Sequence, residues 1–309
     1  MIAFFAKIFG FILNFIYELV NNYGIAIILF SILVKLLMLP ISIKQQKTMK
    51  KSVRIQAKMK EIQFKYKNNP EKLNQETLEL YKNENMSPFS GCFSAIAQII
   101  LLFAVFYLVR SPLTHMKKVD ASVIEKYTKI AQENELSTNS AYPEIELIRE
   151  LGNIRNLANV EKTEETENEK TDLVEINQDE LDSMNINMDF FGLNLAQVPT
   201  QSSDWKAYII PLLYVLVAVL SMRITNPTTK QKETVPVENN DEKSLAKTEE
   251  EFDPMAQMNK NMNMMFPVMY LAVALIAPLG LALYWLMNSL LMIVERLALN
   301  KLLKDEEEK

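Results

Sequence analysis

The stretch YGIAIILFSILVKLLMLPISI (23–43) decides the fold, because it is an apolar run long enough to cross a bilayer as one helix. Its single charged residue is Lys35, and Pro40 lies near its end. Residues 44–60 follow directly and are crowded with lysine and arginine. An apolar run followed by a basic segment is typical of a membrane span whose carboxyl end faces the cytoplasm.

Four further apolar runs alternate with polar stretches along the chain. They are residues 91–109, 207–222, 262–277 and 280–297. Hydrophobic residues make up 49% of the 309 residues, and they are segregated from the charged residues rather than interleaved with them as in a soluble protein. We therefore predict an all-α integral membrane protein with five transmembrane helices.

Residues 1–20 form a different kind of apolar segment, because their polar residues recur at helical spacing. Lys7, Asn14 and Glu18 fall on one stripe, and the opposite side carries five large apolar residues. These are Phe5, Ile8, Ile12, Phe15 and Leu19. The pattern predicts an amphipathic helix at the membrane interface. A cleaved signal peptide is the alternative, but no A-x-A-like site closes the run.

Residues 44–86 are polar and helical in pattern. Apolar residues recur at i, i+4, i+7 and i+11 in the first half, at Ile55, Met59, Ile62 and Tyr66. Asn68-Asn69-Pro70 breaks the pattern, and a second apolar face follows it. That face comprises Leu73, Thr77, Leu80 and Tyr81. The segment is predicted to be a helical hairpin on the cytoplasmic side.

The long loops set the expected orientation. The lysines of the 44–86 hairpin place it in the cytoplasm, whereas residues 111–206 are dominated by Glu and Asp and are expected outside. Alternate crossings then put the N-terminus outside, and the 223–261 loop and the tail 298–309 inside. If residues 1–20 were a sixth span, only the N-terminus would change sides, to the inside.

The 111–206 loop is either a folded cap or a solvated spacer. Its low content of apolar residues favours the spacer, with one short helix near Ile145–Leu151. The stretch 161–180, rich in Glu and Asn, is expected to be mobile. A short apolar element, Phe190-Phe191-Gly192-Leu193, precedes the next span.

Lys35 is the candidate functional residue of the first span. A charge at this depth costs about 2.5–3.5 kcal/mol on insertion scales, which a hydrated cavity open to the cytoplasm would remove. Other spans carry polar residues that could line the same cavity. They are Gln98 and Ser94 in the second span, and Asn288 and Ser289 in the fifth. The alternative is a lysine that only extends its side chain to the headgroups.

Four stretches resemble the signature of the YidC/Oxa/Alb family of membrane protein insertases. They are ILFSILVKLLMLPIS (28–42), KYKNNPEKLNQETLELYKNENMSPFSGCFSAIAQ (65–98), NMDFFGLNLAQ (187–197) and PVMYLAVALIAPLGLALYWLMNSL (267–290). The resemblance covers nearly the whole chain except residues 120–185 and the 224–260 loop. It implies a bacterial inner-membrane protein with a five-helix core, an interfacial amphipathic helix, a cytoplasmic hairpin and a hydrophilic groove in the inner leaflet.

Three positions depart from the family pattern. Lys35 stands where the family has an arginine, and Ser94 replaces the proline that usually follows Gly-Cys-Phe. No lipid-anchoring cysteine follows an N-terminal signal, since Cys92 lies inside a span. The tail ends in Asp-Glu-Glu-Glu-Lys, which places a ribosome-binding role for it in doubt.

The function that the resemblance implies is insertion and folding of membrane proteins, by this chain alone or with the Sec translocon. Nascent membrane proteins and the lipid bilayer are the expected partners; the signal recognition particle receptor and the ribosome are further candidates. The hairpin would contact substrate or delivery machinery through exposed side chains. The residues selected for this role are Met49, Lys51, Arg54 and Met59.

Two other function classes are alternatives to the insertase. A small transporter or channel could use Lys35 as an anion site, but no internal repeat supports it. An enzyme is disfavoured because His115, the single histidine, stands in no H-E-x-x-H or G-x-S-x-G setting. The single cysteine excludes a cysteine zinc site, and no phosphate-binding loop motif occurs. We therefore expect no cofactor, no metal and no direct DNA binding.

Overall fold

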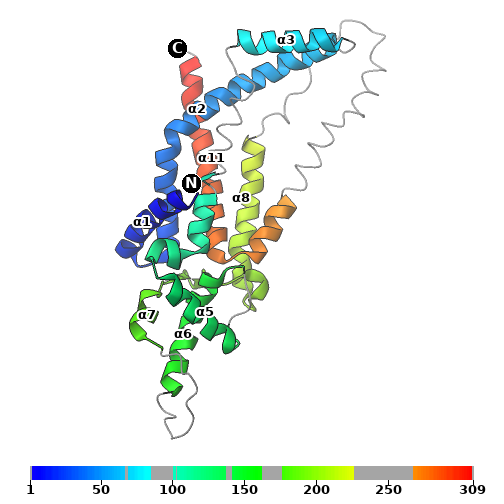
Figure 1. Cartoon of the computed structure of the whole chain (residues 1–309). Helices are drawn as coiled ribbons and strands as arrows, with labels where there is room; N and C mark the ends of the chain where they lie inside the picture. The colour runs from blue at the N-terminus through cyan, green and yellow to red at the C-terminus, as the bar shows by residue number, and fades with distance from the viewer. Residues whose placement is uncertain are drawn as a thin grey trace.

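The computed structural model describes residues 2–66, 69–84, 100–101, 103–136, 141–161, 176–225 and 267–307. These residues are mostly helical (Figure 1). Three helices are long and apolar enough to cross a membrane: Tyr23–Thr48, Trp205–Ile224 and Leu279–Leu302. Pro267–Ile276 is a shorter apolar helix within the expected fourth span. Of the expected second span, residues 103–109 are helical, and residues 91–99 and 102 lie outside the described residues.

The first span and the first half of the hairpin form one helix, α2 (Tyr23–Lys65). The helix continues through Pro40, near which the membrane span was expected to end, so where the span ends stays a prediction. A proline removes one backbone hydrogen bond and bends a helix, and the polar residues beyond it still have helical propensity. Figure 1 shows α2 turning away from the bundle axis on its way to the hairpin. Asn22 caps its start by accepting a hydrogen bond from the Ile25 amide at 3.1 Å.

The helices of the predicted hairpin are present, since α3 (Pro70–Asn83) folds back on α2, while its cytoplasmic location stays a prediction. Its N-terminus has the expected turn chemistry, with Pro70 in the first turn and Asn69 accepting from the Lys72 amide at 3.1 Å. Side chains of the two helices meet as expected: the Thr77 hydroxyl donates to the Met59 sulfur at 3.5 Å. Met59 therefore lies between the two helices rather than on the outer surface of the hairpin.

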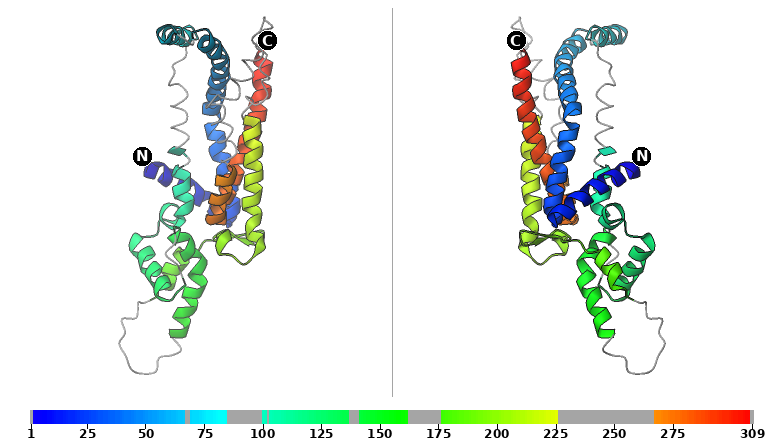
Figure 2. Two further views of the ribbon diagram at one scale, coloured as in Figure 1. Left: turned by 90° about the vertical axis from the view of Figure 1, so that its right-hand side faces the viewer. Right: turned by 90° about the vertical axis from the view of Figure 1, so that its left-hand side faces the viewer.

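The predicted N-terminal helix is α1 (Ile2–Val20), which lies obliquely against the bundle (Figure 2). One stripe packs inward on α2 and on η1 (Leu113–Lys117), and it consists of Ala6, Phe9, Leu13 and Tyr17. The large apolar side chains named from the sequence lie mainly outside this stripe, with Phe15 and Leu19 exposed by 58% and 71%. The helix thus has a packed face, an exposed apolar face and a polar stripe.

The last span, α11 (Leu279–Glu307), runs beside α8 (Ile209–Thr225) and α2. The expected tight turn before it is confirmed, since the preceding helix ends at Ile276 and Pro278 precedes α11. The tail expected from residue 298 onward is a helical continuation of the span as far as Glu307. The cytoplasmic loop expected at 223–261 lies almost wholly outside the described residues.

The expected spacer at 111–206 is wrong, because this segment folds. It contains α5 (Ala121–Glu133), α6 (Pro143–Glu161), α7 (Gln178–Ser183), the hairpin β1 (Asp189–Phe190)–β2 (Leu193–Asn194), η2 (Pro199–Gln201) and η3 (Trp205–Tyr208). Apolar residues of the helices are fully or nearly fully buried, among them Tyr127, Leu147, Ile154, Leu181 and Met184. Of the stretch expected to be mobile, residues 178–180 begin α7, and residues 162–175 lie outside the described residues.

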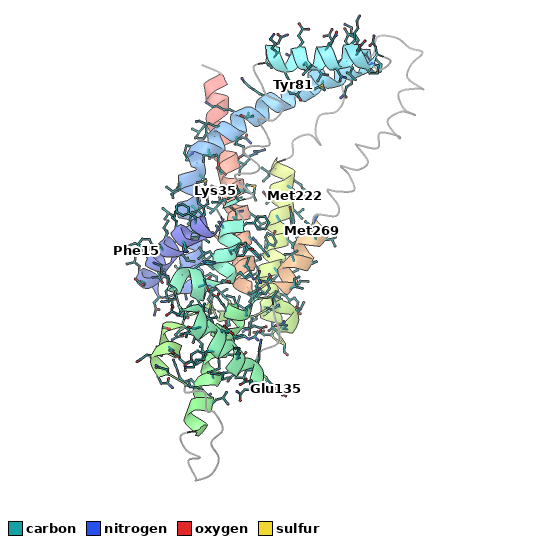
Figure 3. The ribbon with its side chains drawn as sticks, in the orientation of Figure 1. Phe15, Lys35, Tyr81, Glu135, Met222 and Met269 are labelled. Carbon is teal, nitrogen blue, oxygen red and sulfur yellow. The ribbon has the colours of Figure 1, made fainter. Side chains whose placement is uncertain are left out.

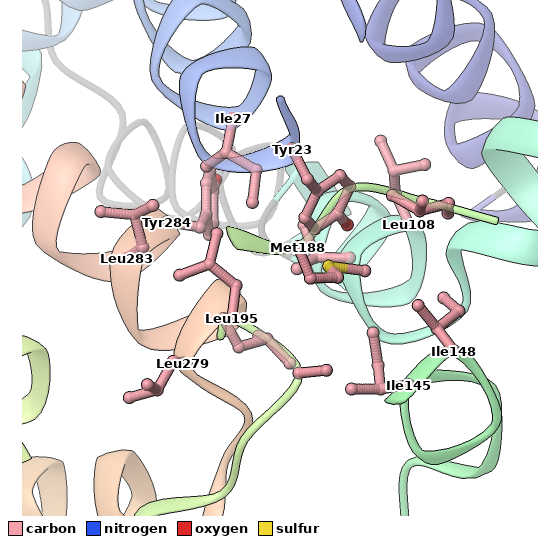
Figure 4. Close-up of a cluster of buried hydrophobic side chains, with 14 of the residues drawn as sticks. Tyr23, Ile27, Leu108, Ile145, Ile148, Met188, Leu195, Leu279, Leu283 and Tyr284 are labelled. Carbon is pink, nitrogen blue, oxygen red and sulfur yellow. The ribbon is translucent and has the colours of Figure 1, made fainter. Parts of the chain in front are cut away.

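The segment 187–197 joins this cap to the membrane helices. The Tyr23 amide donates to the Asn187 carbonyl at 3.0 Å, and the Leu279 and Gly280 amides donate to the carbonyls of Gln197 and Leu195, each at 2.9 Å. The first amides of a helix have no partner within the helix, so this segment satisfies them for both α2 and α11. Figure 4 shows the apolar side of the same junction, where Tyr23, Leu195 and Tyr284 pack together.

The cap and the hairpin lie at opposite ends of the molecule (Figures 1 and 2). The membrane helices between them expose rows of leucine, isoleucine and valine, such as Leu36, Leu216 and Val294. Exposed apolar rows of this kind suit contact with lipid.

Candidate functional site in the membrane bundle

Lys35 lies near the middle of the span Tyr23–Thr48, which has 26 residues. At 1.5 Å per residue it is about 18 Å along the helix from either end. A lysine at this depth needs water or a counter-charge, because a lone ammonium in hydrocarbon is costly.

The counter-charge is the Glu295 carboxylate of α11. Lys35 Nζ and Glu295 Oε2 are 2.6 Å apart, and the two side chains are exposed by 21% and 11%. Both helices start at the cap, since the ring of Tyr23 lies beside Gly280. They run in the same direction, which brings the first half of α2 beside the second half of α11 (Figure 3). A charge pair between two apolar helices is uncommon, because a charge in hydrocarbon is costly unless it is paired or hydrated.

The other oxygen of the carboxylate, Glu295 Oε1, is buried and has no hydrogen-bond partner among the described residues. A carboxylate can accept several hydrogen bonds, so this group is only partly satisfied. Among the described residues, the direct ion pair with Lys35 is therefore the main compensation for the charge of Glu295.

A second polar contact joins the same two helices nearer the hairpin. Gln46 Nε2 donates to Asn300 Oδ1 at 2.7 Å, and Gln46 is 6% exposed. This contact is neutral, unlike the pair formed by Lys35.

A pocket of about 480 Å³ lies between α8, the helix Pro267–Ile276 and α11. Its polar lining residues are Ser221, Asn288 and Ser289, and the Ser221 hydroxyl donates to the Met292 sulfur at 3.6 Å. Apolar and aromatic side chains complete the wall: Tyr214, Ala218, Met222, Met269, Tyr270, Val273, Trp285 and Met292. Met222 and Met269 are labelled on their helices in Figure 3.

The pocket and the charge pair lie along one side of α11. Asn288, Met292 and Glu295 are spaced at i, i+4 and i+7, which places them on one stripe of a helix. Three methionines line the pocket, and methionine adapts its shape to different apolar partners. The stripe offers an apolar groove with a few polar groups and, one turn beyond Met292, a charge pair.

The structure describes some of the residues that the sequence predicted for the groove and for the hairpin contacts. Lys35 contacts α11, while Asn288 and Ser289 line the pocket beside α8. Gln98 and Ser94 lie outside the described residues, so their place in a shared groove stays a prediction. Lys51 is exposed on α2, and the side chains of Met49 and Arg54 are not described.

Glu295 was missed by the reasoning from sequence. The signal was present, because the apolar run 280–297 holds the charged pair Glu295-Arg296. An acidic residue in one span and a basic residue in another make an ion pair possible, but the sequence does not show that these two helices face each other at that level.

His115 lies in η1 at the junction of the cap with α1. Partial burial lowers the pKa of the His115 imidazole, and Lys7 acts in the same direction, while the Glu144 carboxylate opposes them. Glu144 itself accepts hydrogen bonds from the amide and the hydroxyl of Thr114, at 3.0 and 2.6 Å. These contacts link η1 to α6 and give the histidine neighbourhood a structural role.

Comparisons with known proteins place this architecture in context. Residues 15–307 match the model of a family described as 60Kd inner membrane protein. A protein of Caldanaerobacter subterraneus subsp. tengcongensis named membrane protein insertase YidC is 40% identical over 106 residues, which cover 34% of this chain and 52% of the relative.

Two further relatives carry the same name. The one from Fusobacterium nucleatum subsp. nucleatum is 39% identical over 102 residues, covering 33% of this chain and 50% of the relative. The one from Chlorobaculum tepidum is 45% identical over 100 residues, covering 32% of this chain and 17% of the relative. The aligned region thus spans about half the length of these curated relatives or less.

Proposed function

The chain belongs to the 60Kd inner membrane protein family, and from this premise we propose that it inserts other proteins into a bacterial inner membrane and helps them fold. The observation that carries the proposal is the charge pair Lys35–Glu295 between the apolar helices α2 and α11, one helical turn from a pocket lined by polar, aromatic and methionine side chains. Curated relatives named membrane protein insertase support the same conclusion.

The proposed mechanism shortens the apolar distance that a polar segment must cross. The barrier to inserting a span lies in moving its polar flank through hydrocarbon. Lys35, Asn288 and Ser289 would offer polar partners part of the way, with Gln98 and Ser94 contributing from the second span. The apolar part of the substrate would pack on the adaptable pocket wall and then leave into lipid, driven by burial of its apolar surface.

In the proposed orientation the hairpin lies in the cytoplasm and the cap lies outside. The N-terminus is then outside, the C-terminus is cytoplasmic, and α1 lies at the outer interface with its exposed aromatic face toward lipid. Together α2, the second span, α8, the helix Pro267–Ile276 and α11 form the five-helix core. The hairpin receives substrate or its delivery machinery, for which the Sec translocon, the signal recognition particle receptor and the ribosome are candidates.

The alternative function is a small transporter or channel that uses Lys35 as an anion site. A site for a small anion needs an available positive charge, and the Lys35 ammonium already has a carboxylate at 2.6 Å. A binding site for an anion would have to overcome this pairing for every ion transported.

Photo-crosslinking tests the proposed substrate path with a control on the same helix. A photoreactive residue replaces either Met292, which lines the pocket, or Val294, which is 62% exposed to the outside of the bundle. A ribosome-arrested single-spanning protein should crosslink strongly from position 292 and weakly from position 294. Equal crosslinking from both positions would reject the pocket as the path.

A further inference from the structure

The position beside Lys35 that an incoming acidic group would occupy is already filled by the chain itself. Glu295 Oε2 lies 2.6 Å from Lys35 Nζ, which is the distance of a direct charge-assisted hydrogen bond. An acidic side chain of a substrate can therefore reach Lys35 only by displacing this carboxylate or by sharing the ammonium with it.

The carboxylate is not locked in place by a wider network. Its Oε1 atom is buried without a partner among the described residues, and its Oε2 atom is held by Lys35. An ion pair with one unsatisfied oxygen gains less than a fully hydrogen-bonded one, so it opposes an incoming competitor less strongly. The Lys35 side chain is 21% exposed, so the residue is not fully enclosed by the bundle.

We propose that Glu295 is an internal competitor for the Lys35 ammonium, which the acidic flank of an entering membrane protein must displace. The inference rests on the proposed insertase function. By its charge, Glu295 offsets the Lys35 ammonium in the resting state and so sets how strongly the groove discriminates acidic from neutral flanks. Removing the competitor should raise the preference for acidic flanks rather than weaken the groove.

The alternative is that the pair only staples α2 to α11, and the chain offers a matched control for it. The contact between Gln46 and Asn300 joins the same two helices at 2.7 Å and carries no charge. Gln46→Ala therefore loosens the helix pair without changing the charge of the groove. Glu295→Asp keeps the negative charge with a shorter side chain.

The test measures binding and insertion on the full chain in nanodiscs and proteoliposomes. Three apolar single-span peptides are used that differ only in the flank, which carries two aspartates, two asparagines or two lysines. Glu295→Gln should bind the aspartate peptide at least about threefold more tightly than wild type does, a change of about 0.65 kcal/mol. Binding of the asparagine peptide should stay unchanged, and Glu295→Asp should resemble wild type.

Gln46→Ala should change binding of all three peptides by a similar factor or not at all. The proposal is overturned if Glu295→Gln binds the aspartate peptide no more tightly than wild type, or if it changes the three peptides equally as Gln46→Ala does. Insertion is scored in parallel by protection from protease. If Glu295→Gln binds the aspartate peptide more tightly but wild type does not insert protein, the proposed insertase function is rejected and the competitor role of Glu295 stands. If wild type inserts protein but Glu295→Gln shows no selective gain in binding, the competitor role is rejected and the insertase function stands.

Discussion

Lys35 and Glu295 each compensate the charge of the other between the apolar helices α2 and α11. Removing one partner of a buried pair leaves an uncompensated charge, which costs about 3–5 kcal/mol, whereas removing both can be nearly neutral. The two side chains are exposed by 21% and 11%, so the lower end of this range applies.

Lys35→Ala should therefore lower the free energy of unfolding by about 3 kcal/mol. The double variant Lys35→Ala/Glu295→Ala should be more stable than Lys35→Ala alone, because no carboxylate is then left unpaired. Denaturant titration of the purified protein in detergent measures the free energy of unfolding of both variants. A double variant whose loss equals the sum of the two single losses would show that the residues do not interact.

Gly10 is required by close approach of two backbones. A Cβ atom at this position would lie 2.0 Å from the His115 carbonyl oxygen, and a backbone atom cannot rotate away. Gly10→Ala should displace α1 from η1 and lower the free energy of unfolding by roughly 1–3 kcal/mol.

Gly152 in α6 provides the matched control for this prediction. A Cβ there meets nothing within 4 Å, so Gly152→Ala should leave the thermal midpoint unchanged or raise it slightly. Equal midpoints for Gly10→Ala and wild type would contradict the packing of α1 on η1.

Single residues differed in how well the sequence revealed them. Lys35 stood out because a charge in an apolar run is costly wherever it lies. Glu295 was overlooked because it sits near the end of its run, where charges are common. Its contact depends on the relative rotation of α2 and α11, which hydropathy alone does not determine.

At the level of elements, a charge pair holds α5 and α7 of the cap together. Lys126 Nζ and Glu180 Oε2 are 2.9 Å apart. The hydrogen bond from Lys126 lowers the pKa of the Glu180 carboxyl, and the same contact raises the pKa of the Lys126 ammonium. A carboxyl with a lowered pKa stabilises the fold above its unfolded pKa and loses that effect as the pH falls through the folded pKa.

Hydrogen exchange of α7 should therefore accelerate as the pH is lowered through the acidic range, after correction for the intrinsic pH dependence of exchange. Glu180→Gln should abolish this acid-induced acceleration of exchange in α7, whereas Glu125→Gln should leave it intact. Glu125 also has a lowered pKa, caused by its contact with Lys129, but that pair lies within α5 alone. An unaltered acid step in Glu180→Gln would assign it to another group.

Periodicity predicted the elements whose two faces differ in polarity. The stripe of Ile55, Met59 and Tyr66 and the turn before Pro70 were sufficient to predict the hairpin. The cap was mistaken for a spacer because its apolar residues are sparse and distributed over several short elements. They form a core only when α5, α6 and α7 meet, and this is a tertiary effect that no local pattern reveals.

For the whole molecule, the proposed orientation places the hairpin and the cap on opposite sides of the membrane. In a Cys92→Ser background, Lys51→Cys and Lys129→Cys provide exposed labelling sites in the hairpin and the cap. A membrane-impermeant maleimide added to spheroplasts should label Lys129→Cys, and should label Lys51→Cys only after lysis. The reverse pattern would invert the orientation.

The sequence was most informative about the global order of spans and loops, since apolar runs and lysine placement are properties of the whole chain. It was least informative about how the cap and the spans are joined. The segment 187–197 contacts α1, α2 and α11 through backbone groups, which any sequence could supply.

The central claim is that this chain alone inserts membrane proteins through a groove that depends on the charge of Lys35. The most direct measurement is insertion of a single-spanning protein with an acidic tail into proteoliposomes that contain this chain, scored by protection from added protease. We predict protection by wild type and by Lys35→Arg, and its loss in Lys35→Ala. Protection no greater than in empty liposomes would contradict the claim of an autonomous insertase, and equal protection in all three variants would contradict the role of the charge.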